Sequence, residues 1–436
     1  MKDYVKVVGG GLAGSEVALY LAKRGVKVKL YDIKPNKFTP CHHSAGFAEL
    51  VCSNSLKSND VFGNACGLLK EEMRLIGSAI ISAADKTAVP AGKALAVNRE
   101  LFSAQITEEI KNDENIEVIS EEITDIDRED ITVIATGPLT TPALAEKIAQ
   151  ITGSCPYFFD AAAPIVDGES IDRENSFVSD RYGEAGKGDY VNCPLNKEQY
   201  DGFVEELLNA KRAELHDFED DKVFDGCMPI EVMAGRGRDT LRFGPMKPTG
   251  LTDPKTGRWP YACVQLRKEN VAGDSYNIVG FQTNLLFSEQ KRVLSIIPAL
   301  KNAEYFRYGV MHKNTYVKSP GILAVDYSLI GSPNVYFAGQ ITGVDGYVES
   351  AASGLTVAVN VYRKLRGMPP VSFGNSTVIG ALASYISTEN PDFQPMNANY
   401  GILEPTEKHI RDKAARKAYF AERSLNIIKK YREELL

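Results

Sequence analysis

The sequence predicts an α/β fold in which a nucleotide-binding domain is split along the chain by an inserted mixed α/β domain. Three observations predict it. A strand, a glycine-rich turn, a helix and a second strand open the chain, and a similar strand, turn and helix return from residue 334. Between them, residues 156–309 are rich in Tyr, Phe, Gly and Pro, with scattered strand-like runs. We therefore expect the first part of the binding domain at 1–155, the insertion at 156–309, and the second part at 310–436.

The first forty residues have the pattern of a βαβ unit. Residues 5–8 form a short apolar run, residues 15–24 have helical spacing, and residues 26–31 alternate as a second strand. Gly25 lies between the last two segments, where it is expected to end the helix. The same criteria predict further helices at 64–83 and 99–111, and buried strands at 131–135 and 335–338.

The glycine-rich turn has the G-x-G-x-x-G spacing at Gly9, Gly11 and Gly14. The first glycine permits a tight turn, the second lets the backbone approach a pyrophosphate, and the third allows close helix packing. The remaining residues of the turn and helix start, which would face the negative charge, are Gly10, Leu12 and Ala13. Asp32 ends the second strand, where a carboxylate can accept hydrogen bonds from a ribose. The pattern predicts dinucleotide binding.

Two later segments decide between FAD and NAD. Residues 131–137 end at Gly137, and residues 335–340 end at Gly339 and Gln340. Both resemble the later strand-ending motifs of the glutathione-reductase-type FAD fold, a Rossmann-like fold. Gln340 stands where that fold usually has Asp, which keeps hydrogen bonding but removes a charge. Two such segments at the expected distances favour FAD.

The charge of the chain is unevenly distributed. The 436 residues include 50 Lys and Arg against 57 Asp and Glu, a net charge of −7 that argues against a uniformly basic nucleic-acid binder. Residues 408–432, however, hold nine Lys or Arg and two acids, on a predicted C-terminal helix with an apolar stripe at Ile410, Ala414, Ala418, Leu425 and Ile428. Residues 235–258 hold six Lys or Arg and two Asp. Each stretch is either a solvated face or an RNA-binding surface.

The bulk features indicate a cytoplasmic protein. The N-terminus lacks the pattern of a secretory signal, and no apolar run approaches the roughly 18 residues of a membrane helix. The seven cysteines are an odd number and are expected to be reduced thiols. No pair has the spacing of zinc ligands, and His42 and His43 are adjacent, so no metal site is expected.

Two cysteines are candidate catalytic thiols. Cys52 and Cys227 lie in short segments flanked by small polar residues or turns, and Arg236, Arg238 and Arg242 follow Cys227 closely. Nearby positive charge favours the thiolate, which is the nucleophilic form. The other five are expected to be small buried apolar groups: Cys41, Cys66, Cys155, Cys193 and Cys263.

Five segments together resemble one family over nearly the whole chain: residues 47–56, 67–73, 226–234, 243–248 and 339–350. They are similar to the bacterial methylenetetrahydrofolate- and FAD-dependent tRNA (uracil-54-C5)-methyltransferases. The sequence departs from that family's pattern at four positions, where Asn98 replaces an acid, Cys41 and Cys66 replace small apolar residues, and Asn284 replaces a His. If that His holds the folate ring, another residue such as Phe287 would do the stacking.

The resemblance implies an enzyme that methylates uridine 54 in the T loop of tRNA. It implies FAD as cofactor, 5,10-methylenetetrahydrofolate as methyl donor, and NADPH or NADH as reductant. Cys227 is expected to add to uracil C6, which makes C5 nucleophilic, and Cys52 to assist at the flavin as a proton donor or protecting adduct. The two roles could also be exchanged.

The RNA partner follows from the same resemblance. A T-loop uridine must leave its stack to reach a flavin, which requires contacts to phosphates and aromatic faces, and the basic stretches are suited to them. Three alternatives remain at this point. One is a paralogue that methylates a ribosomal RNA uridine, and another is a FAD oxidoreductase without methyl transfer, which needs neither Cys227 nor basic segments. The third is a non-catalytic RNA-binding protein that senses a cofactor.

Overall fold

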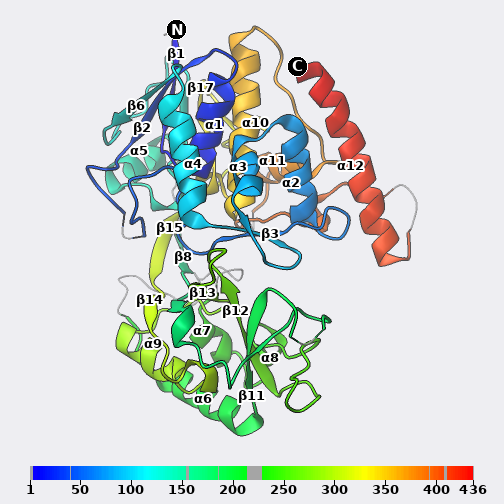
Figure 1. The fold of residues 1–436 in the computed structure, drawn as a ribbon. Helices are drawn as coiled ribbons and strands as arrows, with labels where there is room; N and C mark the ends of the chain where they lie inside the picture. Colours follow the sequence, from blue (N-terminus) through cyan, green and yellow to red (C-terminus); the bar gives the residue numbers. More distant parts are fainter. Residues whose placement is uncertain are drawn as a thin grey trace.

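The computed structural model describes residues 3–39, 41–153, 157–184, 186–213, 228–391, 393–406 and 410–435. Within them the chain forms two parts, drawn one above the other in Figure 1. The upper part contains a sheet whose strand order is β16-β17-β7-β1-β2-β6, parallel except for β16, which is antiparallel to β17. Its strands are β1 (Tyr4–Val8), β2 (Lys27–Asp32), β6 (Ile116–Ser120), β7 (Thr132–Ile134), β16 (Ser328–Leu329) and β17 (Ser332–Phe337).

Helices cover this parallel sheet. They are α1 (Leu12–Ala22), α2 (Ala65–Ile76), α3 (Ala79–Lys86), α4 (Arg99–Asn112), α5 (Pro142–Thr152), α10 (Tyr347–Leu365), α11 (Val378–Ser387) and α12 (Lys413–Leu435). Every residue of α1 is buried, as expected for a helix between a parallel sheet and other helices. Helix α10 packs against α1 at Gly354, where a Cβ would lie 2.5 Å from the Ala13 carbonyl oxygen. The first and last thirds of the chain therefore share one core.

Two small antiparallel sheets extend the upper part toward the lower part. One has the order β3-β5-β4, with β3 (Ser55–Ser58), β4 (Ala88–Val89) and β5 (Ala94–Val97). The other pairs β8 (Tyr157–Ala161) with β15 (Met311–Thr315). Figure 1 shows β8 and β15 between the two parts, so the outgoing and returning chains run side by side where the parts meet.

The lower part is built on an antiparallel sheet with the order β10-β11-β12-β13-β9-β14. Its strands are β9 (Ile165–Asp167), β10 (Phe177–Val178), β11 (Tyr190–Leu195), β12 (Ala262–Lys268), β13 (Ser275–Ile278) and β14 (Tyr305–Arg307). Its helices are α6 (Lys197–Asn209), α7 (Ile230–Gly235), α8 (Thr240–Phe243) and α9 (Phe287–Leu294). Phe203, Phe281 and neighbouring aliphatic side chains form a second hydrophobic core, separate from that of the upper part.

The observed elements confirm the α/β fold class, with a parallel nucleotide-binding-type sheet assembled from both ends of the chain. The boundaries at 155/156 and 309/310 stay predictions, although the antiparallel sheet runs from Ile165 to Arg307. The single helix expected at 64–83 is wrong. Gly77 takes a left-handed conformation with φ of 97°, and the Ser78 hydroxyl accepts a hydrogen bond from Ile81 N–H, so α2 ends and α3 begins there.

Candidate cofactor and thiol site

The glycine-rich turn connects β1 to α1 in a conformation that depends on its glycines. Gly9 has φ of 101°, and a Cβ there would lie 2.6 Å from the Ala135 carbonyl oxygen. A Cβ on Gly14 would lie 1.8 Å from the Gly9 carbonyl oxygen, so this glycine allows helix and turn to touch. A Cβ on Gly11 would meet nothing within 4 Å. Gly11 is also the N-cap of α1 and forms no side-chain cap, which leaves the start of the helix open to a ligand.

Asp32, at the end of β2, fixes this turn through both carboxylate oxygens. Oδ2 accepts a hydrogen bond of 2.7 Å from Gly10 N–H, and Oδ1 accepts one of 2.9 Å from Lys34 N–H. An ionised carboxylate has about four acceptor positions, so Asp32 can still accept from a ribose hydroxyl. Asp32 therefore holds the turn in shape and remains available to a ligand.

A cavity of about 1120 Å³ lies at the carboxyl ends of β1, β2 and β7. We call it the glycine-turn cavity. Nearly all residues that the sequence predicts to bind a cofactor line it, namely Gly9, Gly10, Gly11, Leu12, Ala13, Asp32, Gly137, Gly339 and Gln340. Gly14 is not a lining residue and contributes through packing. Ligands of open α/β sheets bind at this edge, so the predicted cofactor residues lie where the fold class places a ligand.

The two later motifs also line the glycine-turn cavity, and Gly339 lies next to Ala13 of α1. Gly137 and Gly339 both have positive φ, 65° and 86°, at the ends of β7 and β17. Gly339 N–H donates to the Ser353 hydroxyl at 2.7 Å, which ties the turn to α10. The Gln340 amide donates to Asp345 Oδ1 at 3.0 Å. Asp345 therefore supplies a carboxylate close to the position where the sequence lacks one.

Cys52 lies beside the glycine-turn cavity, in the segment just before β3. Val51 and Tyr347 line the cavity, and the Cys52 Sγ is 3.0 Å from the Tyr347 hydroxyl oxygen. The same oxygen accepts hydrogen bonds from Cys52 N–H at 2.7 Å and from Ser53 N–H. Burial raises the pKa of Tyr347 well above its ordinary value, so its phenol stays protonated and can donate to the sulfur. The geometry joins one sequence-predicted thiol to the predicted cofactor cavity.

Comparisons with known proteins agree with this arrangement. The family model described as "Glucose inhibited division protein A" matches residues 4–369. The chain is 56% identical over 433 residues to "Methylenetetrahydrofolate--tRNA-(uracil-5-)-methyltransferase TrmFO" of Acetivibrio thermocellus, covering 99% of each chain. It is 53% identical to the proteins of that name from Ligilactobacillus salivarius, covering 99% of each chain, and Staphylococcus aureus, covering all of each.

The chain belongs to the TrmFO family. Among solved structures it is similar to Aquifex aeolicus GidA, with a TM-score of 0.72 at 15% identity, covering 99% of this chain and 73% of that one. At that identity the likeness shows the fold alone. The predicted family and fold class are both confirmed.

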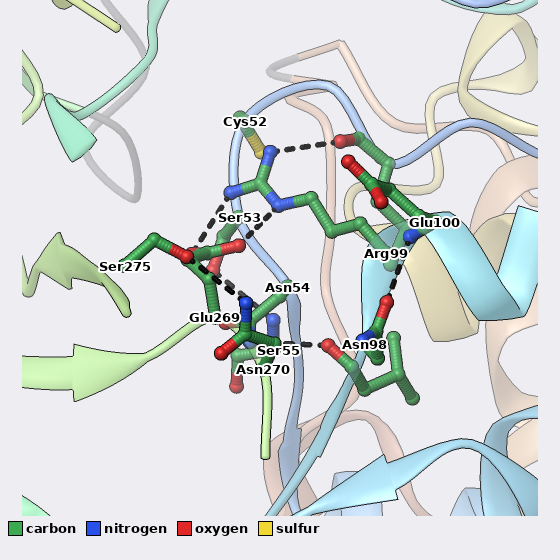
Figure 2. Close-up of polar contacts among 12 residues, drawn as sticks. Cys52, Ser53, Asn54, Ser55, Asn98, Arg99, Glu100, Glu269, Asn270 and Ser275 are labelled. Atoms are coloured by element: carbon green, nitrogen blue, oxygen red, sulfur yellow. Dashed lines mark hydrogen bonds and ion pairs between the residues drawn. The ribbon is translucent and has the colours of Figure 1, made fainter. Parts of the chain in front are cut away.

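In this TrmFO family member the segment that carries Cys52 is held by both parts of the molecule. Figure 2 shows the Arg99 guanidinium between this segment and Glu269. Arg99 forms a two-point ion pair with Glu269, at 2.6 and 3.1 Å, and donates to the Leu50 carbonyl oxygen at 2.9 Å. From β12, Arg267 donates to the Ser53 hydroxyl at 2.7 Å and to the Asn54 side-chain oxygen at 3.0 Å. No local sequence pattern indicates that Arg99, Arg267 and Glu269 contact the segment that carries Cys52.

The second predicted thiol, Cys227, lies outside the described residues, so its distance from Cys52 is not part of the geometry described here. Of the arginines that follow it, Arg238 pairs with Asp201 at 3.0 Å and Arg242 pairs with Asp239 at 2.9 Å. These two positive charges are therefore balanced by neighbouring carboxylates. The catalytic roles of Cys227 and Cys52 stay predictions.

Asn284, where the family pattern has a His, is a buried structural residue. Its N–H donates to Glu231 Oε1 at 2.7 Å, and its side chain donates to the Ala213 carbonyl oxygen at 3.2 Å. Phe287, the proposed replacement for stacking, is 54% exposed and stacks on Tyr308 with a centroid distance of 5.1 Å. An aromatic platform therefore exists close to Asn284 in the chain, whereas Asn284 itself does not face solvent.

The other described cysteines are buried, as expected. Burial raises the pKa of Cys66 to about 11 and that of Cys263 to about 12, so both stay protonated at neutral pH. Cys41 and Cys193 are also buried. The five cysteines that the structure describes form no disulfide with one another. Cys41 and Cys66, which differ from the family pattern, therefore lie in the packed interior. Asn98, which also differs from it, caps α4 by accepting hydrogen bonds from Glu100 and Leu101 N–H.

The C-terminal basic stretch forms α12, which packs on α2 (Figure 1). Its predicted apolar stripe is partly wrong, because Ala414 is exposed and the buried positions include Phe420, Ala421 and Ile428. Two bases contact backbone, since Lys417 donates to the Gly63 carbonyl oxygen and Arg423 to those of Glu404 and Pro405. The exposed bases of the described stretch are Arg411, Lys413, Arg416, Lys429, Lys430 and Arg432.

Two kinds of feature are absent from the described residues, a metal-binding cluster and a membrane-spanning helix. Among them, no cluster of three His, Cys, Asp or Glu side chains is arranged to hold a metal ion. None of the helices formed by this part of the chain has the length and apolar character needed to cross a membrane.

Proposed function

We propose that this protein methylates C5 of uridine 54 in the T loop of tRNA. The carbon comes from 5,10-methylenetetrahydrofolate, the electrons come from NADPH or NADH, FAD binds in the glycine-turn cavity, and the reaction takes place in the cytoplasm. The observation that carries the proposal is the Cys52 thiol beside that cavity, 3.0 Å from the hydroxyl of the lining residue Tyr347, in a chain of the TrmFO family. TrmFO relatives carry the name of a folate-dependent tRNA uracil methyltransferase, which supports the same activity here.

The residues of the cavity fit FAD. The uncapped start of α1, with Gly11 open to the cavity, suits a pyrophosphate, and Asp32 suits a ribose. The ends of β7 and β17, at Gly137 and Gly339, would contact the rest of the dinucleotide. The chemistry that FAD supplies when bound is the transfer of electrons from NAD(P)H to the one-carbon unit, which turns a methylene into a methyl group.

The thiols supply covalent chemistry at the base. Addition of the Cys227 thiolate to uracil C6 forms an S–C6 bond and makes C5 nucleophilic toward the one-carbon unit. C5 then bonds to the one-carbon unit, whose bond to its carrier breaks, and loss of the C5 proton expels the Cys227 thiolate from C6. Cys52, held by Tyr347, gives or takes a proton on the cavity side. The exchange of these two roles predicts a C6 adduct on Cys52 instead.

The exposed bases of α12 support an RNA partner. They add positive charge to a chain whose net charge is −7, and such a local surface contacts phosphates. Replacing Lys429, Lys430 and Arg432 with Ala should weaken tRNA binding and reduce its salt dependence. Unchanged affinity and salt slope would return α12 to a solvated surface helix.

The function is tested by carbon transfer. The FAD-loaded protein is incubated with an unmodified tRNA transcript, carbon-labelled methylenetetrahydrofolate and NADPH, and the RNA is digested and analysed by mass spectrometry. We expect the label in 5-methyluridine at position 54, and no label in a transcript with cytidine there. Label only in ribosomal RNA would favour the paralogue, and flavin turnover without label would favour a plain oxidoreductase.

A further inference from the structure

Arg307 is a half-buried cation that the proposed chemistry does not yet use. It ends β14 and pairs with Ile165 of β9 at the edge of the antiparallel sheet. Its Nη2 atom is buried and has no hydrogen-bond partner among the residues that the structure describes. Leaving a charged donor buried and unsatisfied costs about 1–3 kcal/mol or more, so such an atom calls for a partner.

The surroundings of Arg307 do not neutralise it. The nearest other guanidinium, that of Arg99, is paired with Glu269, and its positive charge together with burial lowers the pKa of Arg307. The groups that act in the opposite direction are the Tyr347 phenol and the thiols of Cys41 and Cys52, and none of them is a carboxylate. The site therefore has an uncompensated positive charge close to Cys52.

Arg307 lines a groove of about 1450 Å³ between α4 and the antiparallel sheet, which we call the α4 groove. Glu49 lines both the α4 groove and the glycine-turn cavity, Leu50 lines the groove, and Val51 lines the cavity. The segment that leads to Cys52 is thus the partition between the two spaces. A ligand in the α4 groove lies beside the site where the proposed reaction occurs.

The groove offers a second cation and little opposing charge at its inner end. Lys111 lines it about 18 Å along α4 from Arg99, at 1.5 Å per residue. Of the three carboxylates that line it, Glu100 and Glu108 are exposed, where water screens them. The third, Glu49, already accepts from His43 and Ser44 N–H. An elongated ligand with an anionic end fits this distribution.

We propose that Arg307 anchors the anionic group, a carboxylate or a phosphate, of a small-molecule co-substrate in the α4 groove. The proposal rests on the proposed function, which requires two such molecules. Tetrahydrofolates have carboxylates on a glutamate tail and no phosphate, whereas NADPH has phosphates and no carboxylate. A guanidinium recognises either group through two parallel hydrogen bonds.

The test measures Kd by calorimetry on FAD-loaded protein at constant salt. The ligands are tetrahydrofolate, a reduced pterin without the p-aminobenzoyl-glutamate tail, and NADPH. The variants are Arg307→Gln and Arg307→Lys, and the control is Arg292→Gln, which removes an exposed arginine paired with Glu289 and Glu206. Flavin content and melting temperature establish that each variant is folded. If Arg307→Gln does not fold, the test uses Arg307→Lys, which keeps the positive charge.

We expect Arg307→Gln to weaken one ligand roughly 10- to 100-fold, Arg307→Lys to weaken it less, and Arg292→Gln to leave it unchanged. If Arg307→Gln loses affinity for tetrahydrofolate but not for the tail-less pterin, the anchored group is the carboxylate. If it loses affinity for NADPH alone, the anchored group is the phosphate. Unchanged affinity for both tetrahydrofolate and NADPH in folded variants overturns the inference. If the wild type binds neither small molecule, the proposed function fails, and the inference falls with it.

Discussion

The two sheets of the molecule contribute to the site in different ways. The parallel sheet forms the glycine-turn cavity with backbone, at turns where Gly9, Gly137 and Gly339 take positive φ. The antiparallel sheet contributes side chains, because the ends of β12 and β14 bring Arg267, Glu269 and Arg307 to the segment that carries Cys52. A ligand site formed by backbone tolerates few substitutions of its glycines, whereas charged side chains can be substituted one at a time without changing the backbone. The predictions below test this difference.

The largest effect is expected at the glycine turn. Gly14→Ala places a Cβ 1.8 Å from the Gly9 carbonyl oxygen, so the turn must shift, and we expect the protein to lose bound FAD. The matched change in the antiparallel part is Gly202→Ala in α6, where a Cβ meets nothing within 4 Å. That variant should keep its flavin. The flavin-to-protein absorbance ratio measures both, and a yellow Gly14→Ala protein would contradict a backbone-built cradle.

The next effect is expected at the tyrosine that holds Cys52. Tyr347→Phe removes the hydroxyl that contacts Cys52 and Ser53 and keeps the ring, so the thiol loses its fixed position. We expect kcat for methyl transfer to fall roughly 10- to 100-fold with FAD still bound. The control is Tyr200→Phe, whose hydroxyl donates to the Arg238 carbonyl oxygen in the antiparallel part. It should cost about 1 kcal/mol of stability and leave kcat unchanged.

A third effect is expected at the contact between the two parts. Glu269→Gln leaves the Arg99 charge without its carboxylate partner at a site where both side chains are mostly buried. Breaking such a pair costs about 3–5 kcal/mol of unfolding free energy. Asp201→Asn breaks a pair with the exposed Arg238 and should cost at most about 1 kcal/mol. Urea denaturation compares them, and equal losses would contradict a buried coupling between the parts.

A fourth effect is a pH dependence of stability that comes from two buried carboxyl groups of the parallel part. Burial raises the pKa of Glu16 and of Glu72 to about 7, although hydrogen bonds from Ser78 and Ser424 among others oppose this. A raised carboxyl pKa gives stability that is full below about pH 4.5 and is lost as pH rises toward 7. We expect each group to contribute about 3 kcal/mol to this decline. In Glu16→Gln the decline should be smaller, and an unchanged pH profile would show that Glu16 is ionised throughout.

The sequence predicted those parts of the site that depend on local backbone geometry. The spacing of Gly9, Gly11 and Gly14, followed by Asp32 at a strand end, determines a turn whose shape needs no distant partner. The end of α2 at Gly77 could also have been predicted, since a glycine followed by a serine is a stop signal and then a start signal for helices.

The remaining parts depend on contacts between residues far apart in the chain. Cys52 and Tyr347 are 295 positions apart, and Arg99 and Glu269 are 170 apart. Neither pair has a fixed spacing, because Cys52 and Tyr347 meet through the tertiary packing of one part and Arg99 and Glu269 meet where the two parts pack together. For the same reason no sequence pattern indicated that Arg307, at the edge of the antiparallel sheet, would line a groove together with Glu49 and Leu50. The structure was needed to connect these residues.

The central claim is that two thiols, one beside the cavity and one at the base, are both required for carbon transfer. It is tested most directly by label transfer from methylenetetrahydrofolate to uridine 54 with wild-type, Cys52→Ala and Cys227→Ala proteins of equal FAD content. We predict label with the wild type only, while both variants remain yellow and folded. Label at wild-type levels with either variant would contradict the account.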